Sequence, residues 1–127
     1  MALLGMIVVS LVLAFLRRTE WIVPEDAKRR ENPVAPSTTG LHAAQDLYRE
    51  NCAKCHGNTG KGDGPEAWQN YPSPVNLADE DRVKKATDGE IFYEISEGRR
   101  PMPGFKKRMS EEQRWDLVNL IRSFSSR

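Results

Sequence analysis

The 127-residue sequence has only two cysteines and almost equal numbers of acidic and basic residues. Two cysteines are too few for a disulfide-stapled fold, and a disulfide across two intervening residues would close only a small loop and stabilise little. With 19 basic and 18 acidic residues the net charge is +1, so overall charge does not point to nucleic acid as a partner. Residues 41–127 also lack any segment with the period-two alternation of a strand. The length allows one small domain with appendages.

The first sixteen residues, MALLGMIVVSLVLAFL, carry no charged side chain and are nearly all apolar. As a helix they would span roughly 24 Å, short of the ~30 Å hydrocarbon core unless residues 21–23 extend the helix and Arg17 and Arg18 snorkel. A cleaved signal peptide is the alternative, but the usual positive n-region and small-residue cleavage site are both missing. We therefore expect residues 1–23 to form a retained membrane-anchor helix.

Residues 24–40, PEDAKRRENPVAPSTTG, are rich in charge, Pro, Ser and Thr and have no apolar period. The three prolines favour extended conformations, in which 17 residues could reach about 50 Å at ~3.1 Å each. The composition predicts an extended linker between the anchor and a domain over residues 41–127.

Between Leu41 and Arg127 we expect three main helices. The first, TTGLHAAQDLYRENCAKCH, places Leu41, Ala44 and Tyr48 on one face. Capping boxes at Thr87 with Glu90, and at Ser110 with Gln113, predict the starts of the other two. Between the first and second helices lies a long Gly- and Pro-rich stretch with at most a turn of helix at EDRVKK. Three helices make only a small hydrophobic core, and a long irregular loop is unusual in a compact domain. Together these features indicate that the domain binds a cofactor.

Both cysteines and one of the two histidines lie in the stretch ENCAKCHGNTGKGDGP, as Cys52, Cys55 and His56. Cys-x-x-Cys-His is the signature of c-type haem attachment, in which the thiols bind two vinyl groups and the histidine ligates the iron. A thioredoxin-like redox pair would need a preceding strand, which the sequence lacks. A zinc site could use His42 as its fourth ligand, although zinc-finger histidines normally lie downstream as a spaced pair.

The stretches LYRENCAKCHGNTGKGDGP, DGEIFYEISEGRRPMPGF and SEEQRWDLVNLIRSF resemble class I c-type cytochromes, the small bacterial monohaem cytochromes c, over roughly residues 41–126. The resemblance implies an all-α fold, with three main helices around one covalent haem c in a crevice. Ala44 departs from the family pattern, which often has Gly at the crossing of the first and last helices. This departure predicts a slightly wider crossing or a shifted contact there.

The resemblance also makes Met102, in RRPMPGF, the expected distal iron ligand, with Pro101 and Pro103 stiffening the loop. Met109 is the rival, and His42 is the least favoured ligand. The ring N–H of His56 should have an acceptor, since histidine ligands generally do, and the resemblance suggests the carbonyl of Pro65.

A haem with His and Met on both axial positions leaves no vacant site, so we expect single-electron transfer and neither enzymatic activity nor a small-molecule substrate. The expected partners are redox proteins, above all an integral membrane respiratory or photosynthetic complex. A peroxidase-like haem enzyme with an open distal site remains an alternative, and a zinc-stabilised binding module a less favoured one.

Residues 99–108 contain five basic side chains and no acid, which indicates either a solvated loop or a positive surface that steers an acidic partner. Arg17 and Arg18 would by the positive-inside tendency leave the domain in the cytoplasm. Bacteria attach c-type haem outside the cytoplasm, and the haem motif is the more specific evidence. We therefore expect a single-pass anchor in the cytoplasmic membrane, with the haem domain on the periplasmic face.

Overall fold

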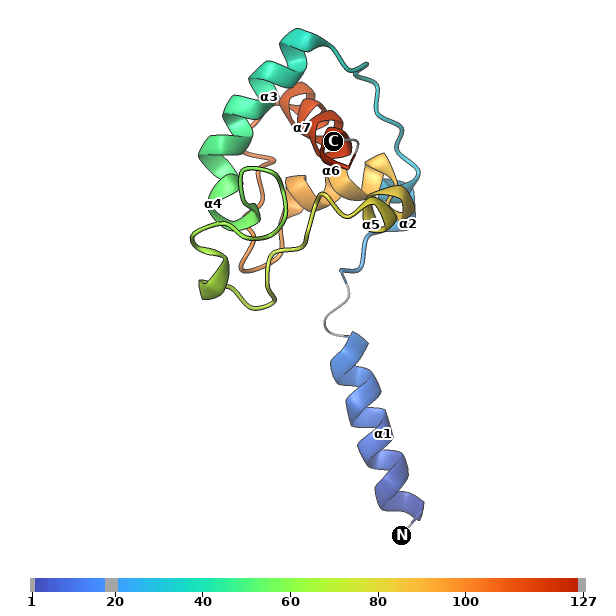
Figure 1. The fold of residues 1–127 in the computed structure, drawn as a ribbon. Helices are drawn as coiled ribbons and strands as arrows, with labels where there is room; N and C mark the ends of the chain where they lie inside the picture. The colour runs from blue at the N-terminus through green and yellow to red at the C-terminus, as the bar shows by residue number, and fades with distance from the viewer. Residues whose placement is uncertain (1, 18–20, 126–127) are drawn as a thin grey trace.

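The computed structural model describes residues 2–17 and 21–125, and within these ranges it contains helices and no strand. Figure 1 shows α1 standing apart from the other helices, which form one helical domain. In chain order the elements are α1 (Ala2–Arg17), α2 (Glu25–Lys28), α3 (Thr38–Asn51), α4 (Ala53–His56), a 3-10 turn η1 (Ala67–Gln69), α5 (Glu80–Lys85), α6 (Asp88–Glu97) and α7 (Glu111–Phe124).

The predicted starts of α6 and α7 are confirmed. The hydroxyl of Thr87 accepts a hydrogen bond from the Glu90 N–H, and the Glu90 carboxylate accepts one from the Thr87 N–H. Ser110 and Gln113 make the same reciprocal pair at α7. Each box satisfies two of the backbone donors that a helix leaves free at its first turn.

The first predicted helix is divided in two at Cys52. Its backbone, at φ −118°, departs from helical values, and its carbonyl accepts hydrogen bonds from the N–H groups of both Cys55 and His56. The break starts α4 as a separate turn. The two cysteines and the histidine therefore lie in and next to one short helical turn, which is not a continuation of α3.

The core lies where α3 packs on α7, with α6 beside them. Ala44 and Val118 have no exposed surface, and the rings of Tyr48 and Phe124 meet edge to face with centroids 5.1 Å apart. The family's usual glycine is thus replaced by an alanine whose methyl group is fully buried.

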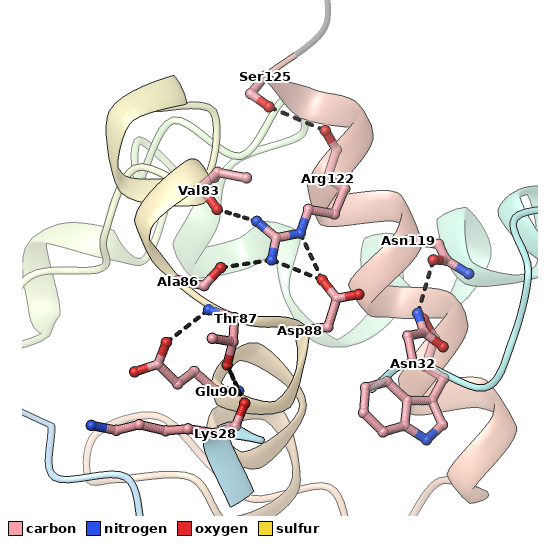
Figure 2. Close-up of polar contacts among 11 residues, drawn as sticks. Lys28, Asn32, Val83, Ala86, Thr87, Asp88, Glu90, Asn119, Arg122 and Ser125 are labelled. Carbon is pink, nitrogen blue, oxygen red and sulfur yellow. Dashed lines mark hydrogen bonds and ion pairs between the residues drawn. The ribbon is translucent and has the colours of Figure 1, made fainter. Parts of the chain in front are cut away.

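Residues 21–37, called here the docked segment, pack against the domain. Val23 is 6% exposed, and the Thr87 hydroxyl donates to the carbonyl of Lys28 at 2.7 Å, as Figure 2 shows. α2 lies on α6 so closely that a Cβ on Gly89 would be 2.0 Å from the carbonyl oxygen of Ala27. The stretch is therefore not the extended tether expected from its composition, and α3 already begins at Thr38.

Two polar side chains fasten the docked segment to α7. The guanidinium of Arg30 pairs with Glu111 at 2.6 Å, and its Cζ lies 4.7 Å from the centre of the Phe92 ring. The Asn32 amide donates to Asn119 at 2.9 Å (Figure 2). These contacts join residues more than 60 positions apart. The periodicity of the sequence could not indicate them because they depend on single polar side chains.

The predicted anchor over residues 1–23 contains the apolar helix α1, whose side chains from Leu3 to Leu13 are exposed. Residues 18–20 of that range, with the expected snorkelling residue Arg18, lie outside the described residues. Among the residues that are described, no helix has both the length and the hydrophobicity needed to cross a membrane. The anchor therefore stays a prediction.

Gly89→Ala should destabilise the protein by about 1–3 kcal/mol, because the added methyl group overlaps the α2 backbone and forces a shift. The measurement is the free energy of unfolding of the haem-loaded protein in guanidinium chloride. Gly5→Ala is the matched control, since its Cβ would meet nothing within 4 Å. Equal stability of the two variants would contradict the close docking of α2.

Candidate cofactor site

A large cavity opens between α4, α6 and the loop over residues 70–77. It holds about 1250 Å³ of space free of protein atoms, part of it open solvent. Its walls are mainly apolar and include side chains from α6, α7 and the loop after α6, namely Ile91, Ile95, Phe105, Leu117 and Ile121. A cavity of this size and character fits a large, flat, mostly apolar cofactor.

Three of the predicted site residues, Cys52, Cys55 and His56, line one wall of this cavity. The turn α4 brings them there, held to α3 and to the following loop. The Tyr48 hydroxyl donates to the carbonyl of Gly57 at 2.8 Å, and burial raises the pKa of this tyrosine, so it stays a neutral donor. Gly57, at φ +79°, then turns the chain away from the cavity.

His56 has its Nδ1 atom 3.2 Å from the carbonyl oxygen of Val75. The acceptor is therefore Val75 in the loop before α5, and the expectation of Pro65 was wrong. Burial lowers the pKa of His56, with the Val75 hydrogen bond acting in the opposite direction. The ring is thus neutral at neutral pH, with Nδ1 as its donor and Nε2 left as the atom able to bind a metal.

The Cys52 thiol does not have the character of the attacking thiol of a redox-active pair. Burial raises the pKa of the Cys52 thiol to about 11, with the neighbouring Cys55 adding to the effect. Reactive disulfide pairs instead lower the pKa of their attacking cysteine, because the thiolate is the nucleophile. The Asn70 amide also approaches the Cys55 sulfur at 3.4 Å.

Met102 lines the same cavity as His56, whereas Met109 is 7% exposed and belongs to the packed core. His42 lies exposed on α3 and is not among the residues that line the cavity. A four-ligand zinc site built from both histidines and both cysteines is therefore not assembled.

The loop that carries Met102 is a tight turn. The Met102 N–H donates to the Arg99 carbonyl at 2.8 Å, and the Arg99 N–H donates to the Met102 carbonyl at 3.0 Å. Gly98, at φ +66°, starts the turn, and a Cβ there would lie 2.3 Å from the backbone nitrogen of Gly104. A larger residue at Gly98 would therefore disturb both the backbone conformation and the return of the loop.

Three residues that line the cavity were not predicted as site residues, namely Trp21, Arg82 and Glu94. Glu94, on α6, is 24% exposed at its side chain and lies 4.0 Å from the Arg82 guanidinium; burial raises its pKa, with Arg82 opposing. Trp21 reaches the cavity from the docked segment. The spacing of Glu94 from Ile91 and Ile95 places it beside the apolar face of α6, a signal that could have drawn attention to it.

Four of the five basic residues in 99–108 are exposed and Arg99 is half-buried, but some of them already have partners in the protein. Lys106 pairs with Glu97 at 3.0 Å, and Arg99 lines the cavity. Arg108 lies over the Phe105 ring at 5.3 Å from its centre. The exposed side chains of Arg100 and Lys107 remain the best candidates for a steering surface.

Comparison with known protein families identifies a cytochrome domain in this chain. The family model for cytochrome c oxidase, cbb3-type, subunit III matches residues 40–121, which include all four predicted site residues. No curated protein matches the sequence.

Two solved structures are similar in fold. A chain of the Kuenenia stuttgartiensis reducing HAO-like protein complex Kustc0457/Kustc0458 has a TM-score of 0.64 and 24% identity over 84% of this chain and 52% of its own length. This chain thus spans about half of that one. The KustC0563 c-type cytochrome has a TM-score of 0.56 and 28% identity over 64% of this chain and 95% of its own. The chain belongs to the cbb3-type cytochrome c oxidase subunit III family, as a small class I c-type cytochrome domain whose cofactor is covalently bound haem c.

Proposed function

We propose that this protein transfers single electrons through a haem c held by Cys52 and Cys55, with His56 and Met102 as the two axial ligands. The observation that carries the proposal is that all four side chains line one large apolar cavity. When bound there, haem supplies an iron that cycles between the ferric and ferrous states. The chain's contribution is to bind, orient and shield that group.

Each residue has a separate task in this proposal. The two cysteines form thioether bonds that hold the cofactor permanently, and the Val75 carbonyl fixes the His56 ring through its Nδ1 proton. The Met102 thioether would be the second residue to bind the iron and would raise the reduction potential relative to nitrogen ligation. An iron held by both His56 and Met102 would have no site for oxygen or a peroxide, so we propose an electron carrier and not an enzyme.

Met102→Ala should open the distal position and lower the reduction potential. The carbon monoxide affinity of the reduced protein should rise because the thioether no longer competes for the iron. We expect a rise of at least about tenfold, which corresponds to about 1.4 kcal/mol of binding free energy. Visible spectroscopy under a carbon monoxide titration measures it, with the core variant Met109→Leu as control. Strong carbon monoxide binding by the unaltered protein would contradict Met102 ligation and favour a peroxidase-like site.

Glu94→Gln should raise the reduction potential and weaken its pH dependence. A carboxylate in the wall of the cofactor cavity would favour the ferric form, so the potential should rise as the pH falls through the raised pKa of Glu94 and the charge is lost. The charged groups around it, Arg82, Glu90 and Arg99, stay in place in the variant.

Potentiometric titration across pH would measure this effect, which we expect to reach up to about 60 mV, a tenfold change in a one-electron equilibrium. Glu97→Gln is the control, since Glu97 is exposed, pairs with Lys106 and does not line the cavity. An identical pH profile for Glu94→Gln and the unaltered protein would contradict the role of this carboxyl.

We also propose that α1, within the predicted anchor over residues 1–23, tethers the protein to the bacterial cytoplasmic membrane, with the haem domain on the periplasmic face. The exposed apolar side chains of α1 support a tether, and the need to attach haem c outside the cytoplasm supports the orientation. The proposed partners are redox proteins, with an integral membrane electron-transfer complex foremost. The family description names an oxidase subunit, and one structural neighbour comes from a protein complex.

Purification from native membranes in mild detergent should recover the haem protein together with integral redox subunits in equimolar amounts. Recovery without partners would indicate a tethered shuttle instead of a fixed subunit. A version that begins at Trp21, placed behind a cleavable signal peptide so that it is still exported, is the matched control and should appear in the soluble periplasmic fraction. Release of the full chain from membranes by a high-salt wash alone would contradict the tether.

A further inference from the structure

We propose that Trp21 is a positioning residue for the Met102 loop. The docked segment brings the Trp21 ring to the cavity wall, where it holds the Arg99 guanidinium and, through it, the turn that presents Met102. The inference rests on Met102 being the distal ligand, and it adds a residue outside the matched domain to the machinery that keeps that ligand in place.

The position of Trp21 is set by the domain, because contacts only a few residues downstream hold the segment. Val23 is 6% exposed whereas Ile22 is 84% exposed, so alternate side chains of this extended stretch face inward and Trp21 shares the inward side. Beyond Val23, the carbonyl of Lys28 is held by Thr87, and Arg30 is held by Glu111. Trp21 is only two residues from the buried Val23, so the packing of Val23 limits where the Trp21 side chain can lie.

Trp21 meets the distal loop through a cation–π contact. The Arg99 Cζ lies 5.0 Å from the centre of the Trp21 ring, within the range of about 6 Å in which this attraction is significant. Trp gives the strongest such contact among the aromatic residues. Both residues line the cavity together with Met102, so the contact lies in the cavity wall itself.

Arg99 is coupled directly to the proposed ligand. Its backbone N–H and carbonyl make the two reciprocal hydrogen bonds with Met102, at 3.0 and 2.8 Å, so the two backbones move together. Arg100 and Pro101, at the tip of the turn, are exposed. The tip thus has solvent on its outer side, and the Trp21–Arg99 contact restrains it on the cavity side.

The test compares Trp21→Ala and Trp21→Phe with the unaltered, haem-loaded full chain. Imidazole is the probe, because it binds ferric iron only when the methionine leaves, and its apparent affinity therefore reports how firmly the Met102 loop is held. Trp68→Ala is the matched control, since Trp68 is 82% exposed and does not line the cavity.

We expect Trp21→Ala to bind imidazole about fivefold more tightly, which corresponds to about 1 kcal/mol of lost cation–π attraction. Trp21→Phe should lie between the alanine variant and the unaltered protein, and Trp68→Ala should show no change. In a double-mutant cycle, the effect of Trp21→Ala should largely disappear when Arg99→Gln is already present. General loosening of the fold would give an additive result instead.

The two proposals fail in different ways. A methionine-to-iron charge-transfer band in the ferric spectrum of the unaltered protein, which Met102→Ala abolishes, tests the ligation itself. Absence of that band would overturn Met102 ligation and this inference with it. Presence of the band with unchanged imidazole affinity in Trp21→Ala, or with additive effects of Trp21→Ala and Arg99→Gln, would overturn the role of Trp21 alone.

Discussion

The large apolar cavity is the constraint on which the rest of the structure depends. Small domains bury a limited fraction of their apolar surface, and here the inner faces of α6 and α7 are directed partly at the cavity and only partly at each other. Ile95 and Leu117 each belong to the core cluster and also line the cavity, so a haem c bound there would complete the core that the helices begin. Covalent attachment suits such a fold, because a cofactor that is part of the core cannot leave without exposing it.

The cavity also explains the shape of the loops. The stretch between α4 and α5 has little regular structure, but its backbone supplies the Val75 carbonyl that fixes His56, while Asn70 approaches Cys55. Glycines at positive φ, among them Gly57 and Gly98, turn the chain at the two edges of the site. A loop of this length is expected where it lines the site that would hold a large cofactor.

The docked segment changes how the N-terminal part of the chain relates to the haem domain. An extended linker would have let the domain move far from its tether, whereas contacts of Arg30 and Asn32 with α7 fix the segment to the domain. The haem site and the end of α1 are then separated by only a short stretch of chain. This arrangement favours a haem domain held near whatever α1 contacts.

The sequence by itself determined the features that rest on neighbouring residues. The haem motif at Cys52, Cys55 and His56, and the helix starts at Thr87 and Ser110, need only residues a few positions apart, so local spacing was enough to predict them. The tertiary structure alone decided the docked segment, the Val75 acceptor, the half-buried carboxyl of Glu94 and the contact of Trp21 with Arg99. Each of these joins distant parts of the chain, or depends on how deeply the fold buries one polar group, and neither composition nor periodicity records such contacts.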